Sequence, residues 1–181
     1  MSLILGILAQ SAGAVAAGSY ESIATVTVGS GGTSFAEFTS IPSTYKHLQI
    51  RCSIRGTANN YQLVRLNSDS ANNYAYHYMY GTGSAIGAGN VTSTSSMGFT
   101  DTTNTASIFN GLIIDILDYT STTKNKTLRG FGGFDTNGAG FLSMNSGLWF
   151  KTPEAVTTVR FTPDTGSYAE YSSFALYGIK D

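Results

Sequence analysis

The stretch KHLQIRCSIR, residues 46–55, is the strongest indicator of fold class in this chain. Its apolar residues, Leu48, Ile50, Cys52 and Ile54, alternate strictly with polar ones. Because successive side chains of a β-strand point to opposite faces of the sheet, the pattern predicts a strand with one buried and one solvated face. Cys52 is the lone cysteine and lies on the apolar side, which predicts a buried thiol rather than a reactive one.

Less regular runs of the same kind occur on both sides of this stretch. They are separated by turn residues and cover 21–28, 35–41, 61–67, 74–80, 107–119, 126–134, 141–150, 156–162 and 173–180. No segment after residue 18 keeps the 3.6-residue period of an amphipathic helix. The sequence therefore predicts an all-β chain, an antiparallel β-sandwich of jelly-roll type. Residues 81–104 are of low complexity and predict an exposed loop or hairpin excursion.

The amino-acid composition excludes some classes of protein and favours others. The 181 residues fit one domain, and with 12% charged residues and a net charge of -1 there is no basic patch for nucleic acid. The 21 glycines and 12% aromatic residues suit many strands joined by tight turns and argue against disorder. A surface so poor in charge favours a protein that packs against others.

The first residues, MSLILGILAQSAGAVAAGS, form an apolar and uncharged segment, and the first Lys or Arg is Lys46. The apolar block is shorter than the ~20 residues of a membrane-spanning helix, and the positive start of a secretory signal is missing. We expect an N-terminal attachment arm over residues 1–18 and a β-sandwich domain over residues 19–181. A cleaved signal and a short strand of the domain's own sheet are the alternatives. The arm residues expected to contact a partner are Leu3, Ile4, Leu5, Ile7 and Leu8.

Residues with catalytic potential are few and scattered. His47 and His77 lie in alternating runs without the spacing of metal ligands. Asp115 and Asp118 are three residues apart, which places them on opposite faces of a strand and prevents a carboxylate dyad. We therefore expect no catalytic residue, no cofactor and no metal site.

A tyrosine-rich run, YAYHYMY at residues 74–80, is the most distinctive binding feature. Alternation places Tyr74, Tyr76, Tyr78 and Tyr80 on one face of a strand. That face could be an aromatic platform for sugar rings, a subunit contact, or a wide core between two sheets. Trp149 is a further aromatic candidate for such a surface.

Four segments together resemble a known group of proteins: Tyr20–Gly29, Ile41–Arg51, Asn73–His77 and Ser173–Lys180. The chain after residue 18 resembles short β-rich structural proteins of the virions of tailed bacteriophages, notably phages of marine bacteria and cyanobacteria. The resemblance implies a non-enzymatic component of the particle. It identifies the family better than the task, since such proteins occur in tails and as decoration.

From the resemblance we expect a protein on the exterior of the phage particle. The first expectation is a short tail fibre or adhesin that docks through its N-terminal arm, and the alternative is a capsid cement or decoration protein. A remoter alternative is a secreted carbohydrate-binding module or glycan-cleaving enzyme. The expected partners are other virion proteins, further copies of the chain in a homo-oligomer such as a trimer, and a host-surface glycan, with neither nucleic acid nor membrane insertion.

Overall fold

The structure is a computed structural model that describes residues 18–180, and its regular elements are all β-strands. The predicted arm therefore lies outside the described residues, apart from Gly18. Between residues 18 and 180 no helix is long and apolar enough to span a bilayer. The strands are β1 (Tyr20–Thr27), β2 (Ala36–Phe38), β3 (His47–Ile54), β4 (Asn60–Leu66), β5 (Tyr74–Gly81), β6 (Ile86–Thr94), β7 (Met97–Thr102), β8 (Asn110–Leu117), β9 (Lys126–Asp135), β10 (Gly140–Trp149), β11 (Val159–Pro163) and β12 (Ser173–Ile179).

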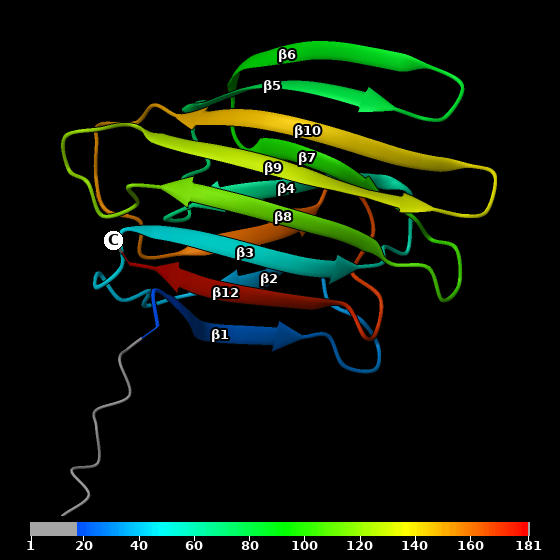
Figure 1. Cartoon of the computed structure of the whole chain (residues 1–181), viewed down its shortest axis with the longest axis horizontal. Helices are drawn as coiled ribbons and strands as arrows, with labels where there is room; N and C mark the ends of the chain where they lie inside the picture. Colours follow the sequence, from blue (N-terminus) through cyan, green and yellow to red (C-terminus); the bar gives the residue numbers. More distant parts are fainter. Residues whose placement is uncertain (1–17, 181) are drawn as a thin grey trace, which may run out of the picture.

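The strands form two antiparallel sheets that pack face to face (Figure 1). The large sheet has eight strands in the order β1-β12-β3-β8-β9-β10-β5-β6, and the small sheet has four in the order β2-β11-β4-β7. The predicted all-β class and antiparallel sandwich are confirmed. Jelly-roll connectivity is not confirmed, because a jelly roll divides eight strands between its two sheets. The segment 81–104, expected as a loop or hairpin excursion, holds two full strands, β6 and β7, and these belong to different sheets.

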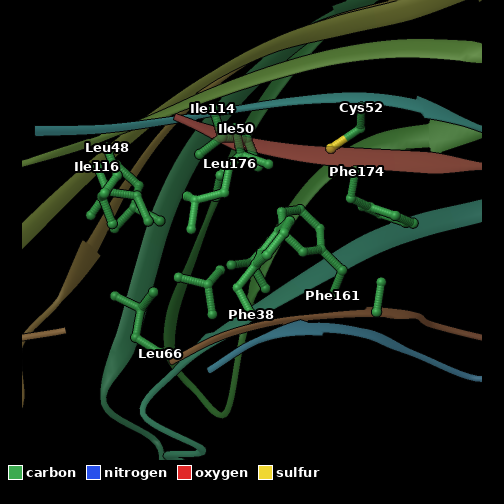
Figure 2. Close-up of a cluster of buried hydrophobic side chains, with 14 of the residues drawn as sticks. Phe38, Leu48, Ile50, Cys52, Leu66, Ile114, Ile116, Phe161, Phe174 and Leu176 are labelled. Carbon is green, nitrogen blue, oxygen red and sulfur yellow. The ribbon is translucent and has the colours of Figure 1, made fainter. Parts of the chain in front are cut away.

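The core lies between the sheets and is built from the alternating runs. In β3 the apolar residues Leu48, Ile50 and Ile54 are fully buried and Cys52 is nearly so, as the alternation predicts. Figure 2 shows Phe38, Leu66 and Phe161 from the small sheet facing the apolar side chains of β3, β8 and β12. Each fully buried side chain of this size contributes about 1.5 to 3 kcal/mol, so this layer holds the two sheets together.

The two sheets differ in width, and this difference shapes the inner face. Strand β7, an edge of the small sheet, packs across β9 and β10, while β5 and β6 extend beyond it (Figure 1). An open strand edge exposes unpaired backbone groups. At the open edge of β7, side chains of the large sheet bond to backbone carbonyls. Asn145 Nδ2 donates to the carbonyl of Gly98 at 3.2 Å, and Asn110 Nδ2 donates to the carbonyl of Asp101.

A tight turn joins β9 to β10 and fixes the register on this side of the sheet. Asn137 and Gly138 both have positive φ, 61° and 131°, and the N–H of Thr136 donates to the carbonyl of Ala139 at 2.7 Å. Asn-Gly is the preferred sequence for a two-residue hairpin turn with positive φ at both positions. The turn brings Phe141, at the start of β10, opposite Phe134.

Candidate functional site

The tyrosines of β5 lie on the inner face of the large sheet, where that sheet extends past β7. Neighbouring rings follow one another along the strand: the centroids of Tyr76 and Tyr78 are 6.1 Å apart, and those of Tyr78 and Tyr80 are 6.3 Å apart. Phe141 of β10 continues the series, stacked on Tyr80 at 5.5 Å with an angle of 15° between the rings. We call these four residues the aromatic ladder.

Glycines of β6 make room for the ladder. Tyr80 pairs across the strands with Gly87, and Tyr78 pairs with Gly89. A Cβ on Gly87 would stand 2.5 Å from the ring of Tyr80, and one on Gly89 would stand 2.7 Å from the hydroxyl of Tyr78. The rings therefore lean over bare backbone, an arrangement known to compensate for glycine in strands.

The ladder forms one wall of a groove that opens at the edge of the sandwich. The same groove is lined by Tyr61 of β4 and Asp101 of β7 on the opposite side, and by Ser143 and Asn145 of β10. Ser143 Oγ donates to Asn145 Oδ1 at 3.2 Å. A concave surface with large aromatic rings and a few polar groups is the usual form of a small-molecule site.

Asp101 is the most unusual group in this groove. Its Oδ1 is buried and has no hydrogen-bond partner among the described residues. Burial raises the pKa of the carboxyl group from 3.8 to about 6, because a charge is costly where water is excluded. The pKa of Tyr61 is raised as well, first by burial and then by the charge of Asp101. Asp101 lines the groove, and a carboxylate is a strong hydrogen-bond acceptor, so this side chain is suited to bind a hydroxyl group of a ligand.

Two residues of the predicted aromatic surface do not belong to the groove. Tyr74 is fully buried and Trp149 is 2% exposed, with the two rings stacked at 6.3 Å. Trp149 Nε1 donates to Asp69 Oδ2 at 2.7 Å, and the hydroxyl of Tyr74 donates to the backbone carbonyl of Leu66 at 3.2 Å. Both side chains anchor the loop after β4 from within the core, and neither can present a ring face to a ligand.

The remaining candidates are dispersed. His77 and Asp115 lie on the outer face of the large sheet, away from the groove, and Asp115 accepts a hydrogen bond from Gln49 Nε2 at 2.8 Å. Asp118 follows β8 and bonds to Lys124 Nζ at 2.7 Å, and His47 Nδ1 accepts the backbone N–H of Asp118 at 2.9 Å. In the part of the chain that the structure covers, no three His, Cys, Asp or Glu side chains come together as metal ligands would.

Sequence reasoning found the face of the tyrosines but not the rest of the groove. Asp101, Tyr61 and Phe141 come from three strands that are distant in sequence. One signal was available: Gly87 and Gly89 recur with the two-residue period of Tyr78 and Tyr80, as expected for a strand that pairs small residues with large ones.

Comparisons with family models, with curated proteins and with solved structures found no match to this chain.

Proposed function

We propose that this chain is a non-enzymatic structural protein on the exterior of a bacteriophage particle, attached to the tail as a short fibre or adhesin, and that its aromatic groove binds a glycan of the host surface. The observation that carries the binding role is the groove itself. The likeness of the sequence to phage structural proteins supports the location, and residues 1–18 carry no charged side chain, which suits a segment that contacts other subunits of the particle.

The chemistry of the groove matches that of a sugar ring. A pyranose has faces of C–H groups and a rim of hydroxyls. The rings of Tyr78, Tyr80 and Phe141 offer large rigid surfaces for the faces. The Asp101 carboxylate is a strong acceptor for a hydroxyl, and Ser143 and Asn145 add neutral partners. The ligand class is thus a neutral carbohydrate, since an acidic one would be repelled by Asp101.

The binding role is tested with a glycan array and titration calorimetry on the full chain. The variants Tyr78→Ala and Tyr80→Ala remove ladder rings, and Tyr20→Ala removes a ring from the outer face as a matched control. We expect each ladder variant to weaken binding at least tenfold, about 1.4 kcal/mol, while the control binds as the wild type does. Absence of any glycan ligand, or equal binding by all the variants, would contradict the glycan role.

The location is tested on assembled particles. Gold-labelled antibody against the sandwich domain should decorate tails, and deletion of residues 2–18 should leave a soluble folded domain that no longer joins particles. A label over the capsid would instead favour the decoration protein. A natural protein lacking its first residues by mass spectrometry would favour the secreted carbohydrate-binding module.

A further inference from the structure

The outer face of the large sheet carries an uncovered apolar row. Ile113, Phe131, Met144 and Met79 are successive cross-strand partners on β8, β9, β10 and β5. Their side chains are between 41% and 53% exposed and line one shallow groove. We call these four residues the apolar row. It lies on the opposite face of the sheet from the aromatic ladder and is independent of it.

A second row of polar side chains runs beside the first. Asp115, Arg129, Ser146 and His77 are again successive cross-strand partners on the same four strands. Arg129 and Asp115 lie 3.9 Å apart and form an ion pair. An apolar strip with a polar border is the usual composition of a protein interaction surface, with a dry centre and a wet rim.

We propose that the apolar row is the docking site for residues Leu3–Leu8 of a neighbouring copy of this chain. The segment is long enough to cover the row. Four strands at a spacing of about 4.8 Å make a row about 14 Å long, and six extended residues span at most about 20 Å. The segment and the row also agree in chemistry, since the segment LILGIL has five apolar side chains and no charge.

The start of the sandwich directs the arm away from its own sheet. The N–H of Lys180 donates to the carbonyl of Ser19 at 2.9 Å, and Tyr20 pairs with Ile179. The chain is thus held in line with β1 as far as residue 19. At Ser19 the backbone therefore points along β1, toward the end of the sheet and not toward its outer face.

The apolar row lies well back from that end. Cross-strand pairing through Arg51 and Ala175 places the row level with Thr25 of β1. Thr25 is five residues after Tyr20, which is about 17 Å along the strand. To reach its own row, an arm would have to reverse direction and pass Tyr20, Tyr177 and Arg51. These side chains stand on the outer face as a stack, with the rings 4.8 Å apart and the guanidinium 5.4 Å from the Tyr20 ring. A row on the next copy needs no such reversal.

Docking of an arm on the next copy is a head-to-tail contact, which closes into a ring when the rotation allows. The experiment uses the full chain in three forms: wild type, an arm variant with Leu5→Asp and Leu8→Asp, and a row variant with Phe131→Ser and Met144→Ser. Phe35→Ser is the matched control, because Phe35 is 42% exposed and lies outside the row. Analytical ultracentrifugation gives the mass of each form, and circular dichroism verifies the fold.

We expect the wild type and the control to be oligomers, and the arm and row variants each to be monomers. An equal mixture of the two variants should give a complex of two chains and no larger species, because one intact arm then meets one intact row. If the row variant fails to fold, Met79→Ser replaces it. A monomeric wild type, an oligomeric row variant, or a mixture that stays monomeric would overturn the proposal, whatever the result with glycans.

Discussion

Replacing Asp101 by Asn should stabilise the fold at neutral pH, although it removes a charged group from the candidate site. Burial raises the pKa of this carboxyl group to about 6, so the charged form is disfavoured in the folded chain. A rise of one pKa unit corresponds to about 1.4 kcal/mol, which sets an upper limit of about 3 kcal/mol for the penalty at pH 7. Because the side chain is partly exposed, we discount this to roughly 1 to 2 kcal/mol.

The sign of the pH dependence follows from the direction of the shift. Between about pH 6 and pH 3.8 the folded chain holds a proton on Asp101 that the unfolded chain has lost. Acidification through this window therefore favours the folded state, and the contribution is lost as the pH rises through about 6. The Asn variant has no titrating group at this position. The difference in unfolding free energy between the two proteins therefore reports the titration of Asp101 alone, without that of the other carboxyl groups.

Urea unfolding of both proteins at pH 4 and pH 7.5 measures this difference. We expect the Asn variant to be more stable by roughly 1 to 2 kcal/mol at pH 7.5 and the advantage to vanish at pH 4. The variant should also bind the glycan more weakly, which would make Asp101 a residue that costs stability and serves binding. An advantage that does not depend on pH, or a less stable variant at pH 7.5, would refute the reasoning.

Two further substitutions test the packing under the aromatic ladder and in the core. Gly87→Ala places a Cβ about 2.5 Å from the Tyr80 ring and should displace that ring, so calorimetry should show weaker glycan binding with a loss of unfolding free energy of no more than about 2 kcal/mol. Gly111→Ala is the control, because its added Cβ meets no atom within 4 Å; equal binding by the two variants would contradict the role of the glycine. Trp149→Phe removes the hydrogen bond to the charged Asp69 and should cost about 1.5 to 3 kcal/mol in urea unfolding, and a smaller loss would show that the indole does not anchor its loop.

The sequence predicted the strands well because alternation is a local property. It also predicted that Tyr74 and Tyr80 share one face, which the structure confirms. It could not predict that the small sheet covers Tyr74 and stops short of Tyr80. That difference depends on where β7, the edge strand of the small sheet, crosses the large sheet. Trp149 is a second case, because its apolar neighbours Met144 and Leu148 are exposed on the outer face of β10 while Trp149 is buried on the inner one.

Strands β6 and β7 escaped prediction for a different reason. Their sequences, IGAGNVTST and MGFTDT, contain glycines together with an asparagine and an aspartate, residue types that are depleted in strands. The large residues that stabilise β6 are supplied by β5, where Tyr78 and Tyr80 lie opposite Gly89 and Gly87. Local propensity misses such a strand, because its stability comes from its partner.

The unequal width of the two sheets also sets the order in which the sandwich opens. Strand β6 has one hydrogen-bonded neighbour, β5, and lies beyond the cover of β7. Its amide protons should therefore exchange with solvent through a local opening that leaves β3, β8 and β12 intact. The glycan site proposed above is built partly on this outlying hairpin, so substitutions in residues 82–95 should change its preferred sugar while the hydrophobic layer beneath β3 keeps its packing.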